Sequence, residues 1–94
     1  MGAFWIANVH VTDEEAYGKY AAIATEAIAQ HGGVFLARAG RYKQLEGRDR
    51  ARNVVAHFPS LEAAEACYNS PRYQEALSHA RGASERDLVI VEEA

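Results

Sequence analysis

Five polar residues of the sequence could together bind and transform a small organic anion. The two histidines could each act as a general acid or base near neutral pH, because the unperturbed imidazole pKa lies there. The arginine could hold a carboxylate or an enolate, and the two asparagine amides could orient a carbonyl group. Such a set suits enolisation or oxygenation of a small anionic or phenolic compound. The candidate catalytic residues are His10, Arg38 and His57, and the candidate substrate-binding residues are Asn8 and Asn53.

Tyr20 is a further candidate for substrate binding. Tyr17 and Tyr20 lie on the apolar stripe of a predicted helix, a position that is typical of the core. A tyrosine hydroxyl near the edge of a sheet could nevertheless reach a ligand, and Tyr20 is the better placed of the two.

The polar residues also have two alternative roles. They could hydrogen-bond one another across a subunit interface and form a polar seam that holds no ligand. His10 and His57 could instead bind a metal ion, but a third ligand would be needed, and Glu92 is the only obvious candidate. This spacing matches no metal-binding motif, so we expect no metal. No motif for dinucleotide binding, phosphate binding or a nucleophile elbow occurs either, so we expect no cofactor.

The composition limits the class of protein. The 94 residues predict a single domain, 1–94, and the net charge of −3 argues against general nucleic-acid binding. No apolar run approaches the roughly 18 residues that span a bilayer, and the N-terminus lacks the features of a signal peptide. The single cysteine, Cys67, excludes an internal disulfide. We therefore expect a cytoplasmic protein with neither a membrane nor a nucleic-acid partner.

Basic residues are concentrated in one segment. Six of the ten lie between Arg38 and Arg52, where only Glu46 and Asp49 offset them. The segment is typical of a solvated hairpin. It could also attract anions to the rim of a site, or pair with acidic helix faces across a dimer interface.

Hydrophobic periodicity predicts the elements that position these residues. A helix opens at the Thr12-x-x-Glu15 capping box and ends at Gly32. A second helix begins after Ser60, restarts at Ser70-Pro71 and ends at Gly82. Alternation of apolar and polar residues, or a continuous apolar run, predicts strands at 4–11, 34–38, 52–58 and 88–91, with 41–45 as an extension of the second.

The order β-α-β-β-α-β predicts an α+β fold, the ferredoxin-like sandwich, in which both helical regions cover one face of a four-stranded antiparallel sheet. The covered face is predicted to carry Trp5, Ala7, Val9, Val11, Phe35, Ala37, Val54, Ala56 and Phe58. The open face is predicted to carry Ile6, Leu36, Val55, Leu88 and Ile90 beside the five polar candidates and Glu92. A face with this many apolar residues should not remain exposed to solvent. We therefore expect the open sheet faces of two subunits to pack together in a homodimer.

Several short blocks, in this order, resemble the DUF1330 family over nearly the whole chain. They are Phe4–Val9, Gly32–Arg38, Arg52–Val55, Phe58–Ser60 and Ser70–Gln74. The resemblance implies a small bacterial protein of unassigned function with a ferredoxin-like protomer and a dimeric α/β barrel. More distantly, the fold is similar to cofactor-independent antibiotic-biosynthesis monooxygenases and haem-degrading monooxygenases. Trp5 and Asn8 match residue types that those enzymes use, although alternation places Trp5 in the core.

Three functions remain open from the sequence. The first is a homodimer that binds a small anionic or phenolic molecule in a pocket on the open sheet face, with acid–base chemistry a further option. The second is a non-catalytic dimerisation or ligand-sensing module. The third is a cofactor-independent monooxygenase.

Overall fold

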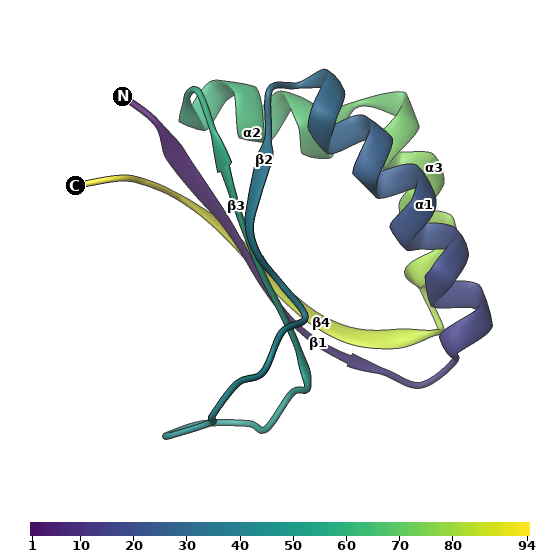
Figure 1. Cartoon of the computed structure of the whole chain (residues 1–94). Helices are drawn as coiled ribbons and strands as arrows, with labels where there is room; N and C mark the ends of the chain where they lie inside the picture. The colour runs from purple at the N-terminus through teal and green to yellow at the C-terminus, as the bar shows by residue number, and fades with distance from the viewer.

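Four antiparallel strands, in the order β2-β3-β1-β4, form a curved sheet whose one face is covered by three helices (Figure 1). The computed structural model describes all 94 residues. The predicted ferredoxin-like α+β fold is confirmed. The elements are β1 (Ala3–Val11), α1 (Glu14–Gln30), β2 (Val34–Arg38), β3 (Arg52–Phe58), α2 (Leu61–Asn69), α3 (Pro71–Ala80) and β4 (Ser84–Glu92).

The helix boundaries follow from capping side chains. Asp13, not the predicted Thr12, is the N-cap of α1, and its carboxylate accepts a hydrogen bond from the backbone N–H of Ala16. The backbone N–H of Thr12 instead donates to the Ala83 carbonyl at 2.8 Å, which keeps Thr12 outside the helix. Gly32 follows α1 with φ 81°, a left-handed conformation that favours glycine. The predicted break is confirmed, since Ser70 caps α3.

The core lies between the sheet and the helices and is built around aromatic rings. Trp5 of β1 is only 1% exposed, so its predicted place in the core is confirmed. Its ring contacts Tyr73 of α3 edge-on, with 5.1 Å between the ring centroids. Phe58 of β3 packs against Trp5 on another side, at 5.5 Å. These contacts tie the helical layer to the two central strands.

Strand β4 is longer than predicted, and its faces are the reverse of those expected. Leu88 pairs with Ala7 and Ile90 pairs with Trp5, so both lie on the covered face. Glu92 pairs with Ala3 and follows the same alternation. Val89 and Val91 occupy the open face instead and are 55% and 47% exposed. The prediction for these residues is wrong because a continuous run of apolar residues does not indicate which of them face the helices.

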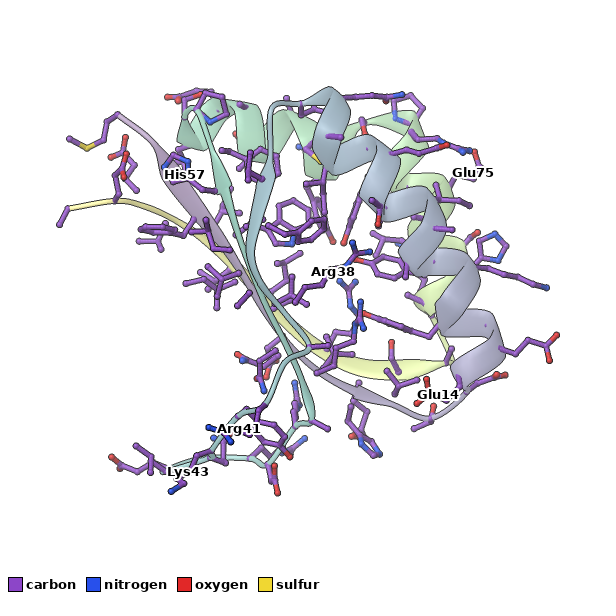
Figure 2. All side chains as sticks on the ribbon, viewed as in Figure 1. Glu14, Arg38, Arg41, Lys43, His57 and Glu75 are labelled. Atoms are coloured by element: carbon purple, nitrogen blue, oxygen red, sulfur yellow. The ribbon has the colours of Figure 1, made fainter.

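A β-bulge in β2 moves Arg38 to the covered face. Phe35 pairs with Ala56, but the next paired residue, Ala37, is opposite Val55. The extra residue, Leu36, shifts the alternation by one position. Arg38 is therefore opposite Val54, on the side of the helices, and the predicted open-face location is wrong. Figure 2 shows Arg38 in the space between β2 and α1.

The segment 39–51 is a loop that projects away from the helical layer (Figure 1). The predicted strand extension at 41–45 is absent, and Arg41 and Lys43 lie in the projecting part (Figure 2). Leu45 is 84% exposed. None of the three helices combines the length and the apolar character that crossing a membrane requires.

Candidate binding site

The polar residues predicted to share one site do not come together, because Arg38 faces the helices and the others are spread along the open face. His57 pairs with Phe4 in the sheet, whereas His10 lies six residues further along β1. At about 3.3 Å per residue this places the two histidines roughly 20 Å apart. They cannot act on one small molecule or share one metal ion within a single chain. Only Asn8 and Asn53 meet, since they are paired across β1 and β3.

The asparagine pair belongs to a network that holds the end of the loop. The Asn8 side-chain amide donates to the Asn53 side chain at 2.8 Å, and Asn53 donates to the Arg50 carbonyl at 2.9 Å. Arg50 in turn donates to the Asn8 carbonyl at 3.2 Å and to the Asp87 carboxylate at 2.7 Å. The Arg50 side chain is buried. These contacts lie within one subunit, so the predicted polar seam across a dimer interface stays a prediction.

His57 lies at the end of the sheet where both chain termini run (Figures 1 and 2). Its Nε2 atom is 3.4 Å from the Glu93 carboxylate, which also accepts a hydrogen bond from the backbone N–H of Gly2. The Gly2 N–H first, and then His57, hold the pKa of Glu93 below its usual value. A side chain at Gly2 would collide with His57. His57 therefore fastens the C-terminal tail, and a catalytic role for His57 or for exposed His10 stays a prediction.

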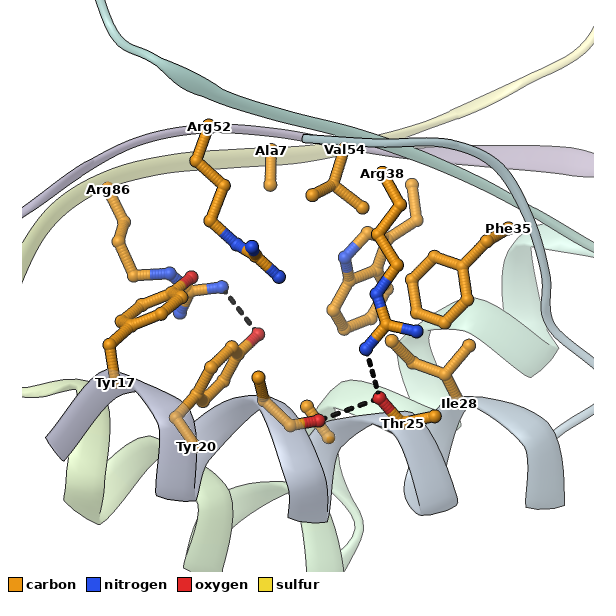
Figure 3. Close-up of a pocket in the computed structure, with 13 residues that line it drawn as sticks. Ala7, Tyr17, Tyr20, Thr25, Ile28, Phe35, Arg38, Arg52, Val54 and Arg86 are labelled. Atoms are coloured by element: carbon orange, nitrogen blue, oxygen red, sulfur yellow. Dashed lines mark hydrogen bonds between the residues drawn. The ribbon is translucent and has the colours of Figure 1, made fainter. Parts of the chain in front are cut away.

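A pocket is present on the other side of the sheet, between the covered face and α1 (Figure 3). It combines apolar walls with three arginines and two tyrosines. The space that a water-sized molecule can occupy is about 20 Å³, close to the volume needed for one water. The lining residues are Trp5, Ala7, Tyr17, Tyr20, Ala21, Ala24, Thr25, Ile28, Phe35, Arg38, Arg52, Val54 and Arg86.

Each arginine of the pocket lies over an aromatic ring. The guanidinium carbon of Arg38 is 4.4 Å from the centre of the Phe35 ring. Arg86 lies 4.6 Å from the Tyr20 ring, and Arg52 lies 5.4 Å from the Tyr17 ring. Cation–π contacts orient a guanidinium without consuming its N–H donors. The three side chains are thus held with donors to spare.

No acidic residue neutralises this cluster. The pocket lining contains no aspartate or glutamate. The ion pairs of the protein involve Arg50, Arg72 and His57, and none involves Arg38, Arg52 or Arg86. The Nε donors of Arg52 and Arg86 are buried and have no acceptor in the protein. Three positive charges around an acid-free pocket strongly favour an anion.

Tyr20 lies in the pocket, where it connects α1 to the edge strand β4. Its hydroxyl accepts a 2.8 Å hydrogen bond from Arg86 and shares a 2.7 Å hydrogen bond with the Tyr73 hydroxyl. Burial, followed by the neighbouring Tyr73, raises the pKa of Tyr20 far above its ordinary value. The phenol is therefore neutral at physiological pH. Its predicted role in substrate binding remains a proposal.

Two arginines of the pocket, Arg52 and Arg86, are not among the site residues predicted from the sequence. Arg52 alternates in phase with Val54 and therefore belongs to the covered face, a signal that was available. Arg86 precedes the predicted start of the last strand at Leu88 and was not assigned to any face. Glu85 and Asp87 are charged and alternate with Arg86, so they would lie on the opposite face. This pattern would extend the last strand to include Arg86.

Comparison with known proteins places the chain in a family. The DUF1330 family, described as a domain of unknown function, matches residues 2–94. The chain belongs to the DUF1330 family. No protein of curated function matches the sequence. The DUF1330 assignment confirms the resemblance inferred from the sequence blocks.

Solved structures share the fold of this DUF1330 protein. A protein of unknown function from Rhodopseudomonas palustris superposes with a TM-score of 0.80 at 19% identity, over 99% of this chain and 82% of that one. SnoaB, a cofactor-independent oxygenase from Streptomyces nogalater, gives 0.66 at 16% identity, over 99% and 93%. A dimeric ferredoxin-like protein of unknown function from Thermobifida fusca gives 0.66 at 18%, over 99% and 92%. Such low identities establish the fold alone.

Proposed function

We propose that this DUF1330 protein binds a small organic anion in the pocket between α1 and the sheet. The observation that carries the proposal is the set of three guanidiniums, Arg38, Arg52 and Arg86, around a pocket without any carboxylate. A bound carboxylate, enolate or phenolate would accept charge-assisted hydrogen bonds from the free N–H donors of these arginines. The location differs from the open sheet face expected from the sequence, but the ligand class is the same.

The walls of the pocket favour a flat or short organic group. Trp5, Ala7, Ala24 and Val54 supply apolar surface beside the cations. The pocket is nearly closed in this conformation, so a ligand must displace side chains. Arg52 has the least to lose, because its guanidinium donates no hydrogen bond within the protein, and Arg38 stands at the exposed rim. We expect these two arginines to move outward and then close on the anion.

Direct titration with small acids tests the proposal. Benzoate should shift NMR signals of α1 and β3 and raise the melting temperature, whereas uncharged benzamide should do neither. Arg52→Met should weaken benzoate binding at least 10-fold, as expected when a charge-assisted contact is lost. Arg41→Met, in the projecting loop, is the matched control and should bind like the parent. If neither benzoate nor aliphatic acids of similar size bind, the proposal is wrong.

A cofactor-independent oxygenase is the second candidate. The observation that favours it is again the cationic cluster, since nearby guanidiniums lower the pKa of a substrate phenol or enol and stabilise its electron-rich anion. Neither His10 nor His57 lines this pocket, so acid–base chemistry by these residues would need a partner subunit. Oxygen uptake with phenolic compounds, without added metal or flavin, tests the activity. No uptake with any compound that binds would count against it.

We further infer that a second copy of the chain covers the open sheet face. Exposed apolar side chains lie along both edge strands of this face, including Val34, Val89 and Val91, which are 61%, 55% and 47% exposed. Burying such a surface against an identical one satisfies both subunits at once. The dimeric neighbour from Thermobifida fusca supports the idea. Sedimentation at micromolar concentration should give about twice the chain mass, and a monomer would refute it.

A further inference from the structure

The three arginines of the pocket are divided between two positions along the sheet. Arg52 and Arg86 both pair with Val9, on either side of β1, and so stand in one row. Arg38 pairs with Val54, which pairs with Ala7 in the row two residues away. Two strand residues correspond to about 6.6 Å. The pocket therefore has a two-arginine end and a one-arginine end.

Helix α1 repeats this division. The Arg86 guanidinium donates to the Tyr20 hydroxyl, whereas Arg38 donates to the Thr25 hydroxyl at 2.5 Å. These two helix residues are five positions apart, which corresponds to roughly 7.5 Å along the axis. Measured along the strands and along the helix axis, the two ends are thus separated by similar amounts, and Arg38 and Arg86 are also separated across the sheet because they lie on the edge strands β2 and β4. Figure 3 shows Arg38 beside Phe35 and Ile28 at one end, and Arg86 beside Tyr17 and Tyr20 at the other.

Small apolar side chains lie beside the arginines in the pocket. Ala7 and Val54 come from the sheet, in the same row as Arg38, and Ala21 and Ala24 come from the helix. Figure 3 shows Ala7 and Val54 between the arginines. These small side chains leave no polar group to meet the middle of a ligand. The arrangement suits a molecule with an apolar centre and a negative group at each end.

We propose that the ligand is a short dianion, such as a flat aromatic diacid, whose two acidic groups point in opposite directions. This inference rests on the proposed anion-binding function. One acidic group binds Arg52 and Arg86 beside Tyr20, and the other binds Arg38, whose guanidinium is held by its hydrogen bond to the Thr25 hydroxyl. A single monoanion would satisfy only one end and would leave the other charge unpaired. A diacid whose groups lie side by side would reach one end only.

The test compares terephthalate, which has opposed carboxylates, with phthalate, which has adjacent ones, and with benzoate, which has one. Calorimetric titration of the full chain should give terephthalate at least 10-fold tighter binding than either of the others. Arg38→Met should remove this advantage by weakening terephthalate far more than benzoate, because benzoate takes the two-arginine end. Arg52→Met should weaken both terephthalate and benzoate. Arg41→Met is the charge-matched control, and circular dichroism confirms that each variant is folded.

The outcomes separate the two proposals. If benzoate binds as tightly as terephthalate, or if Arg38→Met leaves their ratio unchanged, the two-ended site is wrong while anion binding stands. If phthalate binds as well as terephthalate, the opposed geometry is wrong. If none of the three acids binds, both the dianion site and the proposed function fall.

Discussion

The guanidinium of Arg86 on edge strand β4 donates a hydrogen bond of 2.8 Å to the hydroxyl of Tyr20 on α1. The same nitrogen donates to the Tyr73 hydroxyl of α3 at 3.1 Å, and the two tyrosine hydroxyls are 2.7 Å apart. Three polar groups from three elements thus form a closed triangle at one end of the pocket. The triangle fixes Arg86 while leaving its buried Nε without an acceptor.

Removing one hydroxyl of this triangle should lower stability. Tyr20→Phe and Tyr73→Phe should each reduce the free energy of unfolding by about 1–2 kcal/mol, because the remaining buried groups lose a hydrogen-bond partner. Urea denaturation followed by circular dichroism measures the change. Tyr42→Phe is the control, since Tyr42 is exposed and bonds only Asp49, and it should change stability by less than about 0.5 kcal/mol. Equal effects at all three positions would argue against the triangle.

Titration to alkaline pH should reveal that the Tyr20 and Tyr73 hydroxyls are buried. Burial raises the pKa of both Tyr20 and Tyr73, so the folded protein holds them neutral, whereas the unfolded chain ionises near pH 10. Stability from this source is complete below pH 10 and is lost as the pH rises further. Two of the five tyrosines should therefore ionise, by absorbance at 295 nm, only as the structure unfolds. Ionisation of all five before unfolding would contradict the prediction.

Arg50, which anchors the end of the loop, should contribute to folding stability. Arg50→Met removes its contacts with Asp87 and with the Asn8 carbonyl, and we expect a loss of about 1–3 kcal/mol in the free energy of unfolding. Arg48→Met, two positions earlier in the exposed loop, should leave stability unchanged. Urea denaturation of both variants gives the comparison. Similar stability for the two would mean that the network does not hold the loop.

Charge on the open face should dissociate the proposed dimer. Val89→Glu places a carboxylate in a region that the dimer would bury, near the same carboxylate of the second subunit. Burying these two like charges would cost much desolvation free energy. Sedimentation should then give the mass of one chain, with the protomer still folded. Ala22→Glu introduces the same charge on the exposed side of α1 and should leave the dimer intact. A dimer that survives Val89→Glu would place the interface elsewhere.

Local patterns predicted the elements of this fold well. Apolar runs and partial alternation predicted strands β2 and β3 at their observed bounds, and the Ser60 and Ser70 caps marked the starts of α2 and α3. Each of these signals depends on a few neighbouring residues. The Thr12 prediction failed by one residue, because the strand hydrogen bond of Thr12 to Ala83 is a long-range contact.

The candidate site was harder to predict, because it depends on which face each strand presents. A bulge at Leu36 leaves no mark in the composition, yet it reverses the side of Arg38. The run from Leu88 to Val91 is apolar throughout, so its phase was undetermined until pairing with β1 fixed it. The prediction that His10 and His57 share a site is wrong for a different reason, because two residues on the same face of a sheet can still lie far apart along the strands.

The bulge in β2 has an evolutionary consequence. Loss of one residue between Phe35 and Arg38 would remove the bulge and leave the phenylalanine and the arginine two positions apart, so both would still face the helices. Straightening the strand at constant length is instead the change that would transfer this charge from the ligand compartment to the subunit contact. When DUF1330 sequences are aligned, a one-residue gap at this point should therefore mark a lineage that has lost the bulge but kept both ends of the pocket.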